Sequence, residues 1–521
     1  MLEFSVASNR SKEAGAYYGH HGRTHDLACR RRERGVHETQ MKGRFEILSD
    51  SEIDTIHRSS LQILERRGVA VQSPRALKLL ADGGAEVDFT KRLAKLSPDI
   101  TENCLRKHPR TFKLYGRVRK NDLQVTDEHI YAHTTGGCLN ILDHSSGRVR
   151  AGTAKDVEDL MRLVDALENI HQVAMLVYAG DTGPRVSDIH TASLMFRNTT
   201  KGCFITTYTI RNFEYIVKLA AAVQGGIEEL RKTPFLSFGI SPTSPLEISE
   251  DSAEQMMRAA ALGLPIQILP CPQAGGTSPV TLAGTLVQQN VEFLISDVIV
   301  QLTNPGNPVM YAGRPVAIDM RTGTSAFGAV EYGIMSVGTV QLARHYEMPS
   351  DVYGLSTTSK VPDEQAAFEK AMNGLMPALA GASLLSGAGS IESGVTSSPE
   401  QVVIDNEIFG LIFKAARGID VNPDTVAMDL IEKIGPGGHY LSEEHTRKYY
   451  FTEHYLPKLS DRRARADWEK GGGKDIVNSA SLTVEEILRK HSAEPLDRNI
   501  EKEFDRILTE ADKELKFTGT D

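Results

Sequence analysis

Aromatic side chains gather beside the loops that follow the predicted strands of this 521-residue chain. Because aromatic residues make up only 6% of the chain, their placement is informative. Rings around a cavity can hold a quaternary ammonium group, each contributing about 0.5–2 kcal/mol when it is desolvated. The candidates for such a cage are Tyr178, Tyr208, Tyr311, Phe327, Tyr332 and Tyr353. The alternative for each ring is ordinary packing within the protein core.

Charged residues in the same loops are candidates for acid–base chemistry and for binding the other end of a substrate. The catalytic candidates are Asp319, Glu331 and His345, with Asp181 as a further polar group. Glu331 can alternatively complement a helix N-terminus, and His345 can simply cap a helix end. The substrate-binding candidates are Arg314, Arg321 and His133, and a carboxylate could also be bound by Arg185, Arg211 or backbone amides of the Gly-rich loops.

The motifs of metal, nucleophilic and nucleotide chemistry are missing from the sequence. The five cysteines are scattered without a CxxC pair, and neither Cys138 nor Cys271, although near a strand end, has a partner at metal-ligand spacing. We interpret both as structural thiols. The sequence also lacks a GxSxG elbow, a P-loop and a GxGxxG after the first strand. A metal-free site of this kind suits a reaction driven by a cofactor or a second protein.

Eight strand patterns alternate with eight helical patterns and must position these side chains. Short apolar, β-branched runs begin near residues 129, 172, 203, 235, 265, 308, 351 and 383, and amphipathic helical patterns fill the gaps. This count is typical of a TIM (β/α)8 barrel, whose chemistry lies in the loops after the strands. An open doubly wound sheet is the alternative, but the regular spacing favours closure.

The regions that flank the barrel, which we assign to residues 126–420, have other patterns. Residues 44–125 are predicted to form a helical N-terminal subdomain, since two capped helical patterns each end at glycine. Residues 421–521 are predicted to form a helical C-terminal extension packed on the barrel. Residues 1–43 are polar, basic and without periodicity, which predicts a disordered extension.

The composition is that of a soluble globular protein, with 40% hydrophobic and 24% charged residues. A net charge of −9 argues against nucleic acid or an anionic membrane as the main partner. No window approaches the length of an apolar membrane span. The scattered cysteines favour a reducing cytoplasm.

Several segments, in order along the chain, resemble the trimethylamine methyltransferase family. They are SPLEISEDSAEQMMRAAALGLPIQILPCPQAGGTSPVTLAG, QLTNPGNPVMYAG, DMRTGTSAFGAVEYGIMSVGTVQLARHYEMPS, IGPGGHYLSEEHT and LPKLSDRRARADWEKGGGKD. The resemblance runs from roughly residue 44 to 515. It looks like the branch that lacks pyrrolysine, of which glycine betaine:corrinoid protein methyltransferases are the characterised type, and the chain contains only the twenty standard residues.

The resemblance implies a TIM barrel that binds a methylated amine at its mouth and forms a homo-oligomer. A separate corrinoid protein would dock there and present cobalt(I) to take the methyl group, so this chain would hold no cofactor permanently. A quaternary nitrogen leaves as a neutral tertiary amine, which requires neither a metal nor a general acid. Family frequency favours glycine betaine as substrate, while proline betaine, carnitine, γ-butyrobetaine and choline stay open.

Two other functions are consistent with the sequence. A different small methylated donor would need an acid near the leaving group, for which Glu331 or Asp319 is the candidate. A catalytically silent betaine-binding subunit would use the same mouth. An S-adenosylmethionine methyltransferase is disfavoured because the nucleotide-binding glycine motif is missing.

Overall fold

The computed structural model describes residues 39–40, 45–126 and 128–516 of the chain. The predicted disordered extension, residues 1–43, therefore lies outside the described residues apart from β1 (Thr39–Gln40). This strand pairs antiparallel with the first barrel strand, β7 (His129–Thr134).

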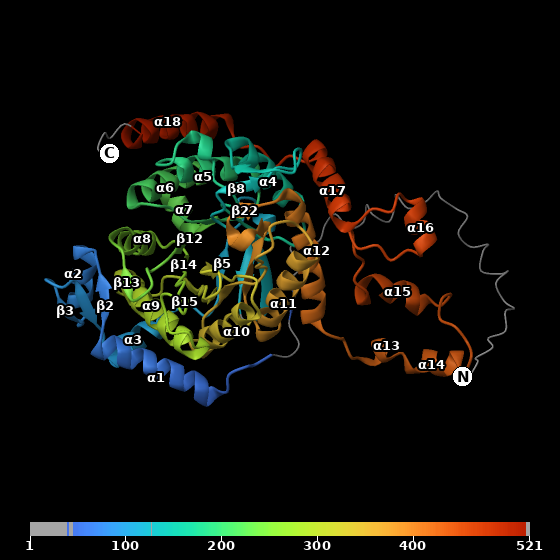
Figure 1. Ribbon diagram of the computed structural model, residues 1–521, viewed down its shortest axis with the longest axis horizontal. Helices are drawn as coiled ribbons and strands as arrows, with labels where there is room; N and C mark the ends of the chain where they lie inside the picture. Colours follow the sequence, from blue (N-terminus) through green and yellow to red (C-terminus); the bar gives the residue numbers. More distant parts are fainter. Residues whose placement is uncertain (1–38, 41–44, 127, 517–521) are drawn as a thin grey trace. The chain divides into compact units, whose positions relative to one another are not determined.

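Eight parallel strands form a closed barrel, which confirms the predicted fold (Figure 1). In order around the barrel they are β7 (His129–Thr134), β10 (Gln172–Ala174), β11 (Gly202–Ile205), β12 (Leu236–Ile240), β14 (Ile266–Ile268), β16 (Val309–Tyr311), β19 (Asp351–Tyr353) and β20 (Leu384–Ala388). A parallel bridge between Tyr311 and Ser350 closes the ring between β16 and β19. All eight strands were predicted within a few residues, because each is a short apolar run buried on both faces.

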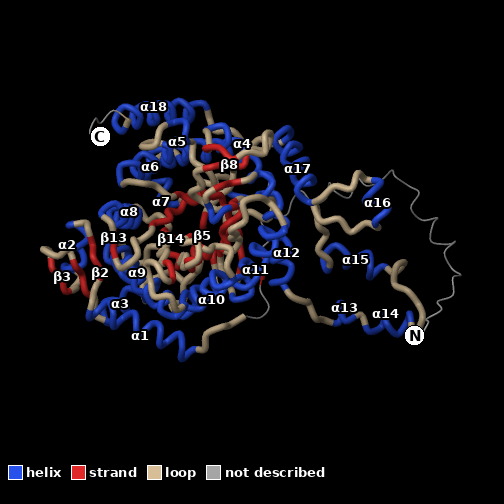
Figure 2. The backbone as a smooth tube through the Cα atoms, in the orientation of Figure 1, coloured by secondary structure: helices blue, strands red, loops and turns tan. Residues whose placement is uncertain are grey.

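The eight predicted barrel helices are also confirmed, and Figure 2 shows them surrounding the strands. They are α4 (Ala154–Ala166), α5 (Ser187–Asn198), α6 (Ile210–Gln224), α8 (Glu250–Ala261), α9 (Leu282–Thr303), α10 (Val330–His345), α11 (Glu364–Ala380) and α12 (Pro399–Arg417), with a short extra helix α7 (Ile227–Lys232) after α6. Local capping fixes several ends: Thr209 accepts a hydrogen bond from the Asn212 amide at the start of α6, and Gly225 ends it with φ +84°.

The N-terminal region contains strands as well as the predicted helices. Its helices are α1 (Asp50–Arg66), α2 (Pro74–Asp82) and α3 (Pro98–Leu105), and its strands are β2 (Val69–Val71), β3 (Glu86–Asp88), β4 (Leu93–Lys95), β5 (Phe112–Leu114) and β6 (Leu123–Val125). β13 (Glu247–Ile248), from the barrel, joins the sheet of β2, β4 and β3. The sequence did not reveal these strands, because three residues are too few to show a period of two.

Small sheets surround the C-terminal mouth of the barrel. One consists of β15 (Gln273–Ala274), β17 (Val316–Asp319) and β18 (Thr324–Ser325), which follow β14 and β16. The other consists of β8 (Asn140–Leu142), β9 (Val149–Ala151), β21 (Ser390–Ile391) and β22 (Thr396–Ser397), which follow β7 and β20. These sheets fix the loops that carry the candidate site.

The last two helices lie against the barrel. α17 (Ile476–Lys490) packs on α4 and α12, and α18 (Arg498–Leu515) packs on α5 and α6. On α18, Phe504 packs beside Phe196 and Glu501 binds Arg197 at 2.8 Å. No helix among the described residues is long and apolar enough to cross a membrane.

Candidate active site

A cavity of about 220 Å³ opens at the C-terminal end of the barrel strands. Its lining comes from the ends of seven strands and consists of His133, Thr134, Thr135, Gly136, Phe204, Thr206, Ser241, Leu269, Cys271, Arg314, Phe327, Tyr353, Ser386, Ser393 and Gly394. The volume is below the roughly 300–1,000 Å³ of sites for drug-sized ligands. The mouth is therefore suited to a small substrate.

Arg314 and His133, two lining residues of this cavity, are joined into a charged network by Asp351, which lies behind the lining. Arg314 Nη2 donates to Asp351 Oδ2 at 2.8 Å, and Arg314 Nη1 donates to the Asp351 carbonyl. His133 Nε2 lies 3.1 Å from Asp351 Oδ1. All three residues are buried. The network joins β7, the loop after β16 and the first residue of β19.

Electrostatics keep Asp351 ionised. Burial alone would raise the pKa of Asp351, but Arg314 and His133 outweigh it and hold that pKa below its ordinary value. Since an ionised carboxylate can only accept hydrogen bonds, His133 Nε2 must carry the proton that it shares with Asp351. The other ring nitrogen, His133 Nδ1, is buried and has no hydrogen-bond partner among the described residues.

Arg314 retains unused donors after pairing with Asp351. Guanidinium has five N–H donors. In Arg314, Nη1 donates to backbone carbonyl oxygens and Nη2 makes a single hydrogen bond, to the Asp351 carboxylate. Within the described ranges, its Nε has no acceptor. This group is fully charged: burial lowers its pKa, but Asp351, Tyr332 and Cys271 together outweigh burial and hold that pKa above its ordinary value. The spare edge can bind an anionic group in a bidentate manner.

Three aromatic rings pack together on one side of the cavity. Phe327 lies 5.9 Å from Tyr353 and 5.4 Å from Tyr332, measured between ring centroids. Phe327 and Tyr353 line the cavity, whereas Tyr332 supports them from behind. The Tyr353 hydroxyl is fixed by Thr135 and Ser390, each at 2.7 Å. These two bonds fix the position of the hydroxyl and therefore the orientation of the ring.

A second aromatic pair lies beside the cavity without lining it. The Tyr178 hydroxyl is 3.2 Å from that of Thr206, a lining residue, and its ring is 5.4 Å from that of Tyr208. Tyr208 is largely exposed. Both residues thus lie at the edge of the mouth.

Cys271 has its thiol at the cavity. The residue is exposed at the mouth, but desolvation of its sulfur raises the pKa of this thiol to about 11, although nearby Arg314 opposes the shift. It donates to the Leu269 carbonyl at 3.3 Å. At neutral pH Cys271 is therefore a protonated thiol, not a thiolate nucleophile.

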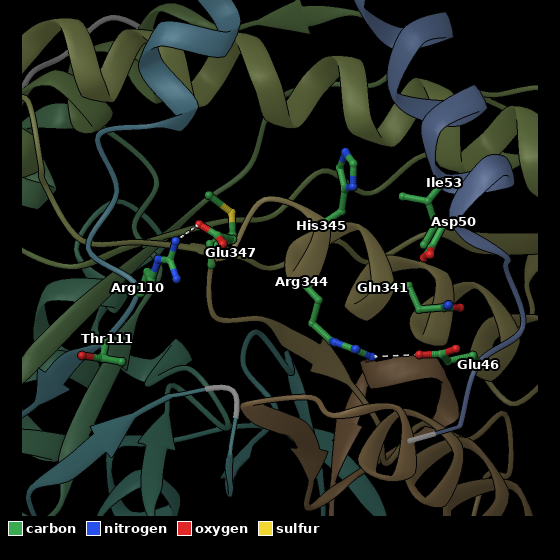
Figure 3. Close-up of a pocket in the computed structure, with 10 residues that line it drawn as sticks. Glu46, Asp50, Ile53, Arg110, Thr111, Gln341, Arg344, His345 and Glu347 are labelled. Carbon is green, nitrogen blue, oxygen red and sulfur yellow. Dashed lines mark ion pairs between the residues drawn. The ribbon is translucent and has the colours of Figure 1, made fainter. Parts of the chain in front are cut away.

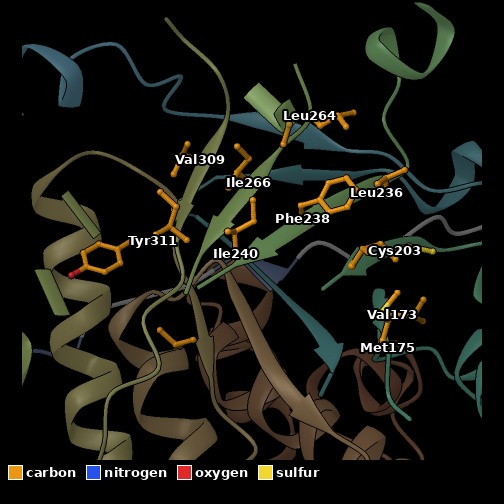
Figure 4. Close-up of a cluster of buried hydrophobic side chains, with 14 of the residues drawn as sticks. Val173, Met175, Cys203, Leu236, Phe238, Ile240, Leu264, Ile266, Val309 and Tyr311 are labelled. Carbon is orange, nitrogen blue, oxygen red and sulfur yellow. The ribbon is translucent and has the colours of Figure 1, made fainter. Parts of the chain in front are cut away.

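Tyr311 lies on the other side of the barrel wall, contrary to the sequence prediction. Its ring stacks on Phe293 of α9 at 3.9 Å, and its hydroxyl bonds to Asn290. Figure 4 shows the ring turned toward a neighbouring helix. Side chains alternate along a strand, so the next residue, Ala312, takes the inward position instead.

His345 is at the wrong end of its helix to act in the mouth. α10 begins beside the mouth and ends 16 residues later, so His345 lies near the opposite end of the barrel. There it lines a separate pocket with Arg344 and Glu347, and Figure 3 shows the ion pairs Arg344–Glu46 and Arg110–Glu347. Burial and nearby His57 lower its pKa.

The predicted acids of the mouth are outside the cavity too. Asp319 and Arg321 belong to the exposed β17–β18 hairpin and bind one another at 2.7 Å. Hydrogen bonds from Arg321 lower the pKa of Asp319 to about 2, so this group stays ionised and cannot act as an acid at neutral pH. Glu331 is exposed in the first turn of α10. Asp181 accepts from the Ala154 amide at the start of α4.

Sequence reasoning missed Asp351 and the hydroxyl groups of the cavity. Asp351 opens a strand of otherwise apolar residues, and a charge in such a position is a signal for a buried partner. The hydroxyls of Thr135, Thr206 and Ser386 carry no pattern that would single them out. Within the described residues, no three His, Cys, Asp or Glu side chains could together hold a metal ion.

Comparison with known proteins places this barrel in a family. The model of the family described as "Trimethylamine methyltransferase (MTTB)" matches residues 19–515. The chain belongs to this family. It is 37% identical over 466 residues to a trimethylamine methyltransferase of Desulfitobacterium hafniense (strain DSM 10664 / DCB-2), covering 89% of this chain and 94% of that protein. The predicted resemblance is confirmed.

Two further relatives differ in the substrate that their names give. A trimethylamine methyltransferase of Methanosarcina barkeri is 35% identical over 475 residues, covering 90% of this chain and 96% of that protein. A glycine betaine methyltransferase of Desulfitobacterium hafniense (strain Y51) is 30% identical over 479 residues, covering 91% of this chain and 99% of that protein. This MTTB family member is thus similar along nearly its whole length to methyltransferases of both kinds.

Proposed function

We propose that this MTTB family member moves a methyl group from a small quaternary amine bearing a carboxylate to the cobalt(I) of a corrinoid protein. Glycine betaine is the favoured substrate. The observation that carries the proposal is a single small cavity in which the rings of Phe327 and Tyr353 accompany the spare edge of Arg314. Aromatic faces attract a quaternary ammonium, and a guanidinium fork attracts a carboxylate.

The reaction suits a site that lacks a nucleophile of its own. The bond between a methyl carbon and nitrogen breaks, and its electron pair stays on nitrogen, which leaves as a neutral tertiary amine. Cobalt(I) supplies the two electrons of the new bond to carbon. No proton moves, so the chain has to orient one methyl group and exclude water. The corrinoid is the methyl acceptor and therefore a second substrate, and we expect no permanently bound cofactor or metal in this chain.

His133 adds a second polar contact. His133 lines the cavity, its Nδ1 is buried without a partner among the described residues, and Asp351 fixes the ring through Nε2. A protonated His133 donates to a substrate carboxylate, and a neutral one accepts from a hydroxyl. This nitrogen is therefore placed to help distinguish carboxylated from hydroxylated amines.

Exposed apolar residues around the mouth support docking of a second protein there. They come from loops and strands at the C-terminal face and are Leu139, Val149, Val280, Met320, Val330, Val361 and Val395. Exposed apolar side chains gathered in this way are typical of interaction sites. A corrinoid protein seated on them would bring its cobalt to the cavity.

The free thiols Cys104, Cys138, Cys203 and Cys271 agree with a reducing compartment, and we place the reaction in the cytoplasm.

Trimethylamine is the second candidate substrate, since two of the relatives are named for it. It lacks a carboxylate and would leave the spare edge of Arg314 unused. A silent betaine-binding subunit is the other alternative, because binding and methyl transfer use the same mouth.

The decisive experiment mixes the purified protein with a reduced corrinoid protein and each of a panel of betaines and methylamines. We expect methyl-cobalt, followed by its absorbance, with glycine betaine or a close carboxylated analogue. Methylation with trimethylamine alone would favour the second candidate. Betaine binding measured by calorimetry without any methylation would favour the silent subunit.

Replacing Tyr353 by alanine should weaken substrate binding by about 10-fold, because one ring of the cage is lost. Tyr311→Ala is the matched control: it should lower the free energy of unfolding by about 3–5 kcal/mol while the dissociation constant stays unchanged. Calorimetric titration with glycine betaine and urea unfolding of both variants check this. Equal dissociation constants for the two variants would remove Tyr353 from the cage.

A further inference from the structure

Small residues line the interior of the barrel just below the mouth. Ala174 of β10, Gly239 of β12 and Ala312 after β16 face inward, and the two alanines form one apolar cluster with Phe204 and Leu269. The interior of a TIM barrel is usually filled by bulky branched residues. Small residues on three strands leave space here, and the side chains that enter this space decide the depth of the cavity.

The ring of Phe204 forms the floor of the cavity. Phe204 of β11 and Thr206, two residues later, both line the cavity, and Phe204 is the one farther from the mouth. A Cβ on Gly239 would lie 2.2 Å from Cζ of this ring, so glycine is needed there for the ring to take its position. The ring centroid is 5.4 Å from that of His133. The ring therefore extends from Gly239 on β12 toward His133 on β7.

A polar layer lies below the Phe204 ring. Gln172, Ser237 and Gln267 each come two residues before an inward-facing residue at the level of the floor, so they lie one step nearer the N-terminal end of the barrel. The Nε2 atoms of the two glutamines donate to Ser237 Oγ at 3.1 and 3.3 Å. Both Oε1 atoms are buried and have no hydrogen-bond partner among the described residues. Since none of the three residues lines the cavity, the Phe204 ring separates it from polar groups below.

The groups expected to bind the two ends of the substrate lie at different depths. Tyr353 follows Asp351 by two residues on the same face of β19, so its ring lies one step, roughly 6–7 Å, nearer the mouth than the Asp351 carboxylate. That carboxylate holds Arg314 and His133, and His133 lies beside the Phe204 ring. The ammonium end of a substrate would therefore lie toward the mouth, where cobalt must approach, and its carboxylate would lie on the floor.

We propose that Phe204, seated over Gly239, sets the length of the substrate, here called the length limit. This inference rests on the proposed function and narrows its substrate class to betaines with a short linker between nitrogen and carboxylate. Glycine betaine has one methylene group in this linker, and its carboxylate can lie above the ring. γ-Butyrobetaine has three, so with its ammonium group in the cage its carboxylate would overlap the ring. Phe204 is thus a specificity-determining residue and takes no part in the chemical step.

Calorimetric titration of the full-length protein with glycine betaine and γ-butyrobetaine tests the length limit without a corrinoid protein. The wild type should bind glycine betaine at least about 100-fold more tightly, since a packed pocket discriminates by about 10- to 200-fold for one methylene group. Phe204→Ala should reduce this ratio to about 10-fold or less, because the longer molecule gains the space of the ring and reaches the polar layer. Phe204→Leu, which retains part of the bulk, should give an intermediate ratio.

Two further variants make the test specific. The methyl group added by Gly239→Ala would clash with the Phe204 ring and push it toward the cavity, its open side, so glycine betaine should bind about 10-fold more weakly or worse. Phe238→Ala is the matched control, because Phe238 is also on β12 but faces outward, with its ring 4.2 Å from that of Phe213 (Figure 4). It should lower the stability of the fold and leave both dissociation constants unchanged.

The outcomes separate the length limit from the proposed function. A wild type that binds neither betaine would overturn the proposed function and the length limit with it. A wild type that binds glycine betaine, with the same ratio in Phe204→Ala and Phe238→Ala, would overturn the length limit alone, as would equal binding of both betaines by the wild type. Circular dichroism and thermal unfolding verify that each variant is folded. Phe204→Leu and Gly239→Ala keep the test decisive if Phe204→Ala does not fold.

Discussion

Replacing Arg314 by lysine should lower kcat/KM for a carboxylated quaternary amine by about 100-fold. Lysine keeps the positive charge and can still pair with Asp351, but it cannot present two parallel N–H donors to a substrate carboxylate. The loss should appear mainly in KM, because the carboxylate is bound equally before and during methyl transfer. Rates of cobalt methylation over a range of glycine betaine concentrations measure both constants.

Two comparisons make this prediction specific. Tetramethylammonium has no carboxylate, so its slower reaction should change by less than about threefold in Arg314→Lys. The Arg321 side chain, on the β17–β18 hairpin, is 88% exposed. Arg321→Lys should therefore leave kcat/KM unchanged for both substrates. If Arg314→Lys slowed both substrates equally, Arg314 would support the fold of the mouth and not bind the carboxylate.

Replacing Lys370 by methionine should destabilise the protein by about 3–5 kcal/mol, since it leaves a buried carboxylate without its counter-charge. Lys370 and Asp405 are both fully buried and 2.8 Å apart. Burial raises the pKa of Asp405 and lowers that of Lys370, while each partner opposes the shift of the other. Asp405 also accepts from the Gly389 amide at 2.7 Å.

The effect should extend to the cavity, because Gly389 precedes Ser390, which holds the Tyr353 hydroxyl. Urea unfolding measures the loss of stability. The double variant Lys370→Met with Asp405→Leu should recover most of it, since no charge is then left unpaired. Lys218→Met, which removes an exposed pair with Glu510, should cost less than about 1 kcal/mol. If Lys370→Met also lowered the free energy of unfolding by less than about 1 kcal/mol, water would have to reach Asp405.

The sequence alone determined the order and type of the barrel elements. Each strand is a short apolar run, and most of the helices are longer amphipathic runs, so local periodicity carries much of this information. The position of the site followed as well, since the loops after parallel strands meet at one end of a barrel. His133, Arg314, Phe327 and Tyr353 were found in this way, and all four line the cavity.

Only the tertiary structure decided which neighbouring residues face that cavity. A shift of one residue turns a strand side chain from the interior to the helices, which excludes Tyr311 and admits Ala312. The length of α10 carries His345 away from the mouth. Asp351 acquires its role from Arg314 and His133, on two other strands. Such contacts join residues distant in sequence, and local patterns therefore cannot predict them.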